Sequence, residues 1–136
     1  MKIQTNPYLT FPGTCEEAFT FYARVFGGKI EAMMPHAGTP AEAHAPAEWK
    51  RKILHARLSF HGQALMASDS PPSHYQKPQG IAVSIGLTDP AEADRIYAAL
   101  SEKSPQIIVP LGPTFWAKKF AMFTDRFGIP WMINCE

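Results

Sequence analysis

The spacing of hydrophobic residues predicts two helices, one in each half of the chain. Thr14 and Glu17 form the pattern of a capping box, in which the hydroxyl and the carboxylate each accept from a backbone N–H. Apolar residues then recur at positions 18, 21, 22 and 25 until Gly27 ends the run. In the second half, Asp89-Pro90 is typical of a helix start, and positions 93, 96, 97 and 100 repeat the apolar face. We therefore predict helices over residues 14–27 and 89–102.

Short segments rich in β-branched and aromatic residues, bounded by Gly or Pro, predict strands between these helices. In one of them, over residues 51–61, apolar side chains alternate with His55, Arg57 and Ser59, so that one face is apolar and the other polar. The order of elements is therefore strand, helix and three strands, given twice. The eight predicted strands are 3–11, 28–35, 51–61, 63–69, 80–88, 105–112, 114–124 and 129–135.

The two halves also resemble each other in sequence, which predicts an internal duplication. A residue in the first predicted helix and its match in the second helix lie further apart along the chain than matching residues in the last strands of the two halves. An extra stretch at residues 36–49 of the first half explains this difference. We predict a single domain, 1–136, made of two βαβββ units at about 1–70 and 79–136. The matching residues are Glu17, Ala18, Tyr22, Gly62, Met66 and Ser68 with Glu92, Ala93, Tyr97, Gly128, Met132 and Asn134.

Composition and charge exclude several classes of function. The 136 residues include 13 Lys and Arg and 12 Asp and Glu, without a basic run, so nucleic acid and anionic membranes are not expected partners. No stretch approaches the ~20 apolar residues of a membrane span, and the first residues lack the apolar segment of a signal peptide, so a cytoplasmic location is expected. Two cysteines, Cys15 and Cys135, are too few for a disulfide scaffold and lack the spacing of a zinc site.

Among residues that could carry chemistry, His55 is the strongest candidate because it lies mid-strand on the polar face. A neutral imidazole there would act as a general base or donate a ligand, although it could equally bond to a neighbour or lie at a subunit contact. Arg57 on the same face could hold a carboxylate or phosphate, or be simply exposed. Asp69, at a strand end, is expected to cap its own turn. Cys15 is expected to be structural, although a helix start can lower the pKa of a thiol.

Several motifs, in order along the whole chain, resemble the PhnB-like branch of the vicinal oxygen chelate superfamily, which includes glyoxalase I, extradiol dioxygenases and bleomycin-resistance proteins. No single motif is specific, but their order and spacing together are. The motifs are Pro7-Tyr8-Leu9-Thr10-Phe11, Glu17-Ala18, Phe21-Tyr22, Phe26-Gly27-Gly28, Lys52-Ile53-Leu54-His55-Ala56, Leu65-Met66-Ala67-Ser68-Asp69, Thr114-Phe115-Trp116 and Asp125-Arg126-Phe127-Gly128-Ile129-Pro130-Trp131-Met132-Ile133-Asn134.

The resemblance implies an α+β fold in which two βαβββ units form curled mixed sheets around a cavity, with a helix outside each sheet. Small ligands bind in such cavities. Aromatic and methionine side chains would give the cavity a lining suited to a flat or apolar molecule, although such residues are also common in plain cores. With His55 as the catalytic candidate, the expected ligand-binding residues are Tyr8, Arg57, Met66, Ser68, Trp116, Phe120, Met132 and Asn134.

In metal-dependent relatives, the first and last strands of each unit supply the His or Glu ligands. Those positions fall here at Pro7, Ala82 or Val83, Met66 and Met132, and shifting each by one residue still brings in no His, Asp or Glu. No metal ligands and no cofactor are therefore expected. Some relatives are described as demethylubiquinone methyltransferase-like, but the chain has no strand–GxGxxG–helix motif for an adenosyl cofactor.

Our leading hypothesis from the sequence is a metal-free protein that binds a small molecule. The alternative is a metal-dependent lyase or dioxygenase with displaced ligands drawn from His55, Asp69 and a loop histidine, and a third is a purely structural interaction domain. Because relatives are commonly homodimers and exposed strand edges need protection, we also expect a homodimer. The linker over residues 70–80 is long enough for the two units to pair within one chain or across the dimer.

Overall fold

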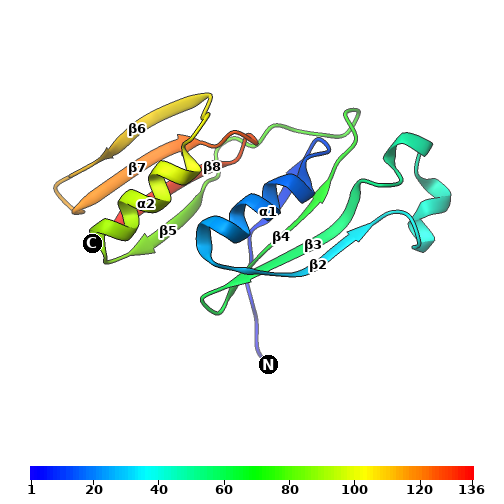
Figure 1. The fold of residues 1–136 in the computed structure, drawn as a ribbon, viewed down its shortest axis with the longest axis horizontal. Helices are drawn as coiled ribbons and strands as arrows, with labels where there is room; N and C mark the ends of the chain where they lie inside the picture. Colours follow the sequence, from blue (N-terminus) through cyan, green and yellow to red (C-terminus); the bar gives the residue numbers. More distant parts are fainter. The chain divides into compact units, whose positions relative to one another are not determined.

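The computed structural model describes residues 1–136 and contains the order strand, helix and three strands twice (Figure 1). The chain divides into two compact units, Met1–Gln76 (unit 1) and Lys77–Glu136 (unit 2), which are described separately. Unit 1 contains β1 (Tyr8–Phe11), α1 (Cys15–Phe26), β2 (Lys29–Pro35), the short 3-10 helices η1 (Pro40–His44) and η2 (Ala47–Trp49), β3 (Ile53–Phe60) and β4 (Gln63–Asp69). Unit 2 contains β5 (Val83–Leu87), α2 (Pro90–Leu100), β6 (Gln106–Gly112), β7 (Lys119–Thr124) and β8 (Pro130–Cys135).

Each unit has one open four-stranded mixed sheet with the same topology. The strand order is β1-β4-β3-β2 in unit 1 and β5-β8-β7-β6 in unit 2. In both sheets the first and last strands of the unit pair in parallel, and the remaining pairs are antiparallel. The fold is therefore α+β, and the predicted order of two βαβββ units is confirmed.

One helix packs on one face of each sheet and buries the apolar residues of that face (Figure 1). In unit 1, Ala56 and Leu58 of β3 are fully buried, and the ring of Phe60 stacks on Phe26 of α1 with centroids 4.5 Å apart. In unit 2, Tyr97 of α2 meets Phe123 of β7 edge to face. The face of each sheet away from its helix is called here the open face of that unit.

The helices cover the predicted spans, but the buried stripe of α1 differs in one position. Phe19 is fully buried, whereas Phe21, which the sequence placed on the apolar face, is half-buried. The full stripe has two residues for each turn of the helix, because α1 packs across several strands of a broad sheet. Its members are Cys15, Ala18, Phe19, Tyr22, Val25 and Phe26.

The predicted capping box at the start of α1 is wrong. Thr14 is the N-cap residue but makes no side-chain hydrogen bond to the helix. Instead the carboxylate of Asp69, at the end of β4, accepts from the backbone N–H of Cys15 at 2.9 Å, of Gly13 at 3.1 Å and of Ile53 at 2.9 Å. The expectation that Asp69 caps its own turn is therefore also wrong, because its partners lie in distant segments.

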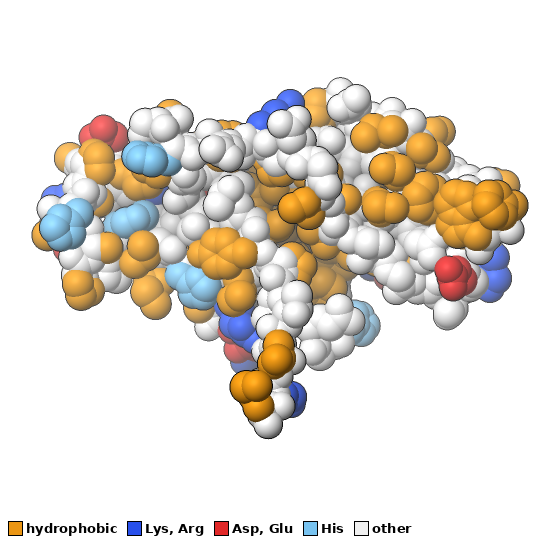
Figure 2. All heavy atoms as spheres, turned by 180° about the vertical axis from the view of Figure 1, so that it is seen from behind, with side chains coloured by type: hydrophobic (Ala, Val, Ile, Leu, Met, Phe, Trp, Pro, Cys, Tyr) orange, Lys and Arg blue, Asp and Glu red, His pale blue; other side chains and the backbone are white.

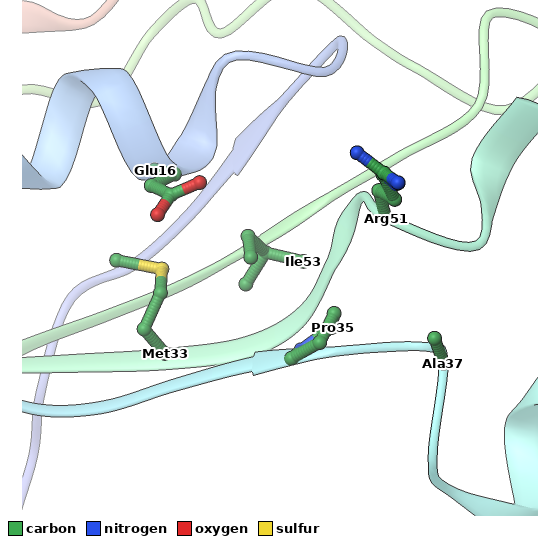
Figure 3. Close-up of a pocket in the computed structure, with 6 residues that line it drawn as sticks. All are labelled: Glu16, Met33, Pro35, Ala37, Arg51 and Ile53. Carbon is green, nitrogen blue, oxygen red and sulfur yellow. The ribbon is translucent and has the colours of Figure 1, made fainter.

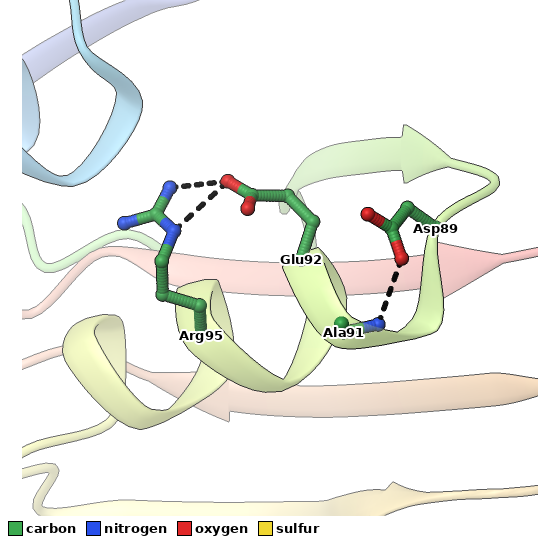
Figure 4. Close-up of polar contacts among 4 residues, drawn as sticks. All are labelled: Asp89, Ala91, Glu92 and Arg95. Atoms are coloured by element: carbon green, nitrogen blue, oxygen red, sulfur yellow. Dashed lines mark hydrogen bonds and ion pairs between the residues drawn. The ribbon is translucent and has the colours of Figure 1, made fainter.

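The start of α2 follows its prediction. Asp89 is the N-cap and accepts from the backbone N–H of Ala91 at 3.0 Å, with Pro90 in the first helical turn (Figure 4). Glu92 pairs with Arg95 one turn along the helix. A local cap suffices here because the required acceptor lies two residues from its donor.

Most of the predicted strands are shorter in the structure, and the first and seventh are shortened most, by five residues each. The first begins at Tyr8, immediately after Pro7, whose ring nitrogen has no hydrogen to donate to a ladder. Residues 114–118 form a turn before β7, in which the Thr114 hydroxyl accepts from the N–H of Ala117 at 3.0 Å. Trp116 therefore lies on a turn and not in a strand. Neither α1 nor α2 has the length and hydropathy of a transmembrane helix.

Candidate functional site

The open face of unit 1 brings Tyr8 and His55 together. The Tyr8 hydroxyl and His55 Nδ1 lie 3.4 Å apart, and the two rings stack with centroids 6.0 Å apart. They come from β1 and β3, which flank β4, so the sheet register and not the sequence makes them neighbours. Tyr8 is 48% exposed, which leaves its ring available to a molecule in solution.

Arg57, Met66 and Ser68 lie on the same open face. Arg57 is opposite Met66 in the β3–β4 ladder, and its Nη1 lies 3.6 Å from the Met66 sulfur. Met66 is also aligned with Tyr8 across the parallel β1–β4 pair. Five residues named from the sequence thus share one surface that offers a hydroxyl, an imidazole, a guanidinium and a thioether. They are Tyr8, His55, Arg57, Met66 and Ser68.

The open face of unit 2 is aromatic. Trp116 Nε1 donates to Asn134 Oδ1 at 3.1 Å, and the indole meets the Phe120 ring edge to face with centroids 5.2 Å apart. Asn134 Nδ2 donates in turn to Glu136 Oε1 at 2.9 Å, so both ends of the amide are engaged. The indole is 48% exposed although its N–H is satisfied. The part of this aromatic surface that faces solvent is the Trp116 indole, since Phe120 is only 8% exposed.

Phe115 extends this aromatic surface and was not selected from the sequence. Its ring contacts Trp116 edge to face at 4.8 Å and is 97% exposed. A signal existed in the Thr114-Phe115-Trp116 motif, where two adjacent aromatic residues sit in a turn. Met132 lies on the same open face, opposite Met122, whereas Trp131 is buried on the helix side and its N–H bonds to Asp125.

No group of three or more His, Cys, Asp or Glu side chains in the chain could hold a metal ion. At the parallel strand pairs, Tyr8 aligns with Met66 and Ser84 with Met132. Asp69, which the displaced-ligand alternative requires, already accepts from three backbone N–H groups. The residues present therefore give no support to that alternative.

The loop histidines and Cys15 have structural surroundings. His36 Nδ1 bonds to the Lys52 carbonyl at 2.9 Å, and His74 Nδ1 lies 3.0 Å from the Ser73 hydroxyl. Cys15 is fully buried, and burial, with Asp69 and Glu16 nearby, raises its pKa to about 12. A thiol with this pKa is protonated at neutral pH, and the burial of Cys15 favours its structural interpretation.

Comparison with known proteins adds relatives that match along nearly the whole chain. The family model described as 3-demethylubiquinone-9 3-methyltransferase matches residues 3–134. Protein YjdN of Escherichia coli (strain K12) is 31% identical over 137 residues, covering 95% of this chain and 92% of that protein. Protein PA1353 from Pseudomonas aeruginosa is 48% identical with a TM-score of 0.90, covering 99% of this chain and 98% of the other.

Two more distant structures share the fold. The PhnB protein from Bacillus cereus is 23% identical with a TM-score of 0.83, covering 98% of this chain and all of that one (100%). A bleomycin-binding protein from bleomycin-producing Streptomyces verticillus, complexed with copper(II)-bleomycin, is 15% identical with a TM-score of 0.60. That comparison covers 100% of this chain and 98% of the other. The chain thus belongs to the family described as 3-demethylubiquinone-9 3-methyltransferase, and it shares its fold with the PhnB protein and with the bleomycin-binding protein.

Proposed function

We propose that this protein binds a small organic molecule through the open face of unit 2, without covalent chemistry. The observation that carries the proposal is the half-exposed Trp116 indole, which Asn134 and Phe120 hold in one orientation. A large apolar ring exposed to water is stabilised when a flat molecule covers it, and fixing the ring beforehand lowers the entropy lost on binding. The copper(II)-bleomycin complex of the Streptomyces verticillus protein, on the same fold, supports a small-molecule role.

We propose that the open face of unit 1 is a second, separate binding surface, which offers polar contacts. Arg57 offers a guanidinium for a carboxylate or phosphate group, and the Tyr8 hydroxyl and His55 imidazole offer donors and acceptors. Because His55 Nδ1 faces Tyr8, the opposite ring nitrogen is the one that would meet a ligand. His55 is thus a binding residue in this proposal.

Methyl transfer, which the family description names, does not fit the residues at either helix start. An adenosyl cofactor is commonly held by a glycine-rich strand-to-helix turn, but Pro12-Gly13-Thr14 precedes α1 and Thr88-Asp89 precedes α2. A carboxylate occupies each helix N-terminus, Asp69 at α1 and Asp89 at α2. The proposal is therefore ligand binding and involves no transferred group.

The binding proposal is tested with a planar aromatic probe, 1-naphthol, in a titration followed by calorimetry. Replacing Trp116→Ala should weaken binding about ten-fold, equivalent to ~1.4 kcal/mol, because stacking beyond area burial contributes up to about that much. Trp49→Phe, a matched change in the loop between β2 and β3, should leave affinity unchanged. Equal affinity of wild type and Trp116→Ala, or no binding by either, would refute the aromatic surface as a ligand site.

We also propose that the protein is a homodimer. Each sheet is open, with β1 and β2 at the edges of one and β5 and β6 at the edges of the other, and exposed edges favour association. Large exposed apolar side chains support the same proposal, and they occur in both units. Light scattering at micromolar concentration should report about twice the 15.1 kDa chain mass, and a mass equal to one chain would contradict the proposal.

A further inference from the structure

A pocket of about 310 Å³ lies entirely within unit 1, on the helix side of its sheet (Figure 3). This volume is at the lower end of the range for small-ligand sites, ~300–1,000 Å³. Met33 of β2 pairs with Ala56, which α1 covers, so the pocket and the open face lie on opposite sides of the sheet. The pocket is lined by Glu16, Met33, Pro35, Ala37, Arg51 and Ile53.

The floor of the pocket is apolar. Ile53 is 4% exposed and pairs with Pro35 across the β2–β3 ladder. Met33 lies beside them with its thioether directed toward the hollow, as Figure 3 shows. Methionine is flexible and polarisable, so it adapts to the shape of a bound hydrocarbon. This part of the pocket fits a short apolar chain.

Two opposite charges flank this floor. Glu16 comes from the first turn of α1 and Arg51 from the segment just before β3, and in Figure 3 they lie on either side of Ile53. Both residues are exposed, and neither side chain forms a hydrogen bond or an ion pair within the chain. Both charges are therefore free to meet a ligand that carries the complementary charges.

Unit 2 has no counterpart to the segment that borders the pocket. Residues 36–52, with η1 and η2, connect β2 to β3, whereas residues 113–118 alone connect β6 to β7. Ala37 and Arg51 stand at the two ends of the longer connection, where the Ala37 N–H donates to the Lys50 carbonyl at 2.9 Å. This backbone bond fixes the rim of the pocket.

We propose that the pocket binds a small zwitterion whose ammonium and carboxylate groups are separated by an apolar segment. The ammonium would meet Glu16, the carboxylate would meet Arg51, and the apolar segment would cover Ile53 and Met33. The separation is required because the two charged side chains lie on opposite sides of the floor and not side by side. The site is distinct from the open faces of the proposed function, and its test is independent of theirs.

The test uses 6-aminohexanoate as the probe, with hexanoate and hexylamine as controls that carry one charge each. Methyl resonances of Met33 and Ile53 in NMR spectra report occupancy directly. We expect both methyls to shift in a saturable titration with 6-aminohexanoate. The controls should bind up to about five-fold more weakly, because one exposed ion pair contributes at most ~1 kcal/mol.

Single substitutions test which pocket residue meets which charged group of the probe. Arg51→Gln should bring the affinity for 6-aminohexanoate down to that for hexylamine, and Glu16→Gln should bring it down to that for hexanoate. Lys50→Gln and Glu17→Gln remove neighbouring exposed charges that do not line the pocket, and they should leave affinity unchanged. The proposal fails if neither methyl shifts, if the singly charged probes bind as well as the zwitterion, or if the control variants weaken binding as much as the pocket variants.

Discussion

Unit 1 and unit 2 place the same strand positions on their open faces but fill them with different side chains. The position opposite Met66 in the antiparallel ladder is Arg57, whereas the position opposite Met132 is Met122. All five histidines lie in unit 1, and the exposed Phe115–Trp116 pair lies in unit 2.

The view from behind shows this difference, with histidine colour over unit 1 and a dense cluster of hydrophobic side chains over unit 2 (Figure 2). The fold fixes where side chains project, and the chemistry at those points is set independently in each half.

The two helices also differ in which residue accepts hydrogen bonds from the backbone N–H groups at their starts. The backbone N–H of Cys15 in α1 is satisfied by Asp69 from β4, a residue 54 positions away. In α2 the acceptor is Asp89, two residues from its donor. One unit thus relies on a tertiary contact and the other on a local one, which makes the energetic consequences of the two carboxylates unequal.

The largest expected effect separates these two carboxylates. Asp69→Ala leaves three backbone donors without an acceptor, two of them buried, and should lower the free energy of unfolding by about 3 kcal/mol or more. Asp89→Ala removes one exposed cap and should lower it by about 1 kcal/mol. Urea denaturation of both variants measures the difference, and equal losses would contradict the distinction between a tertiary and a local cap.

A smaller effect separates two glycines. A methyl group added at Gly28 would lie 2.8 Å from the Ser59 carbonyl oxygen, a backbone atom held in the sheet, so Gly28→Ala should destabilise by about 1–3 kcal/mol. At Gly86 in unit 2 nothing lies within 4 Å of such a methyl. Gly86→Ala should therefore be neutral or stabilise by up to ~1 kcal/mol. Thermal unfolding of the two variants measures these effects. A greater loss of stability in Gly86→Ala than in Gly28→Ala would contradict the comparison.

The smallest effect on stability at neutral pH concerns ionisation of the Cys15 thiol, the first residue of α1. The first residue of α2 is Pro90. Because burial raises the pKa of Cys15 from 9.0 to about 12, the folded state favours the protonated thiol. Its contribution to stability is complete below pH 9 and is lost as the pH rises toward 12. As the pH rises through this range, the urea midpoint should fall less steeply for Cys15→Ala than for wild type. Parallel curves would show that the thiol contributes nothing to the pH dependence of stability.

Local patterns in the sequence were sufficient for the order and spans of the elements. Helical periodicity and alternation depend on residues a few positions apart, so both helices and all eight strands were predicted, with errors mostly at their ends. The local cap at Asp89 was predicted for the same reason. The residues of the open face of unit 1 followed from alternation along β3, which separated His55 and Arg57 from the buried side chains.

The tertiary structure alone decided which distant residues meet. Asp69 replaces Thr14 as the acceptor at α1 because β4 ends beside that helix, and no short-range pattern encodes this contact. Trp116 and Asn134 were both named as ligand residues, but their hydrogen bond depends on a turn that the sequence pattern placed in a strand. Side-chain contacts across strands depend on register and on the paths of connecting segments, and these are set by packing of the whole unit rather than by neighbouring residues.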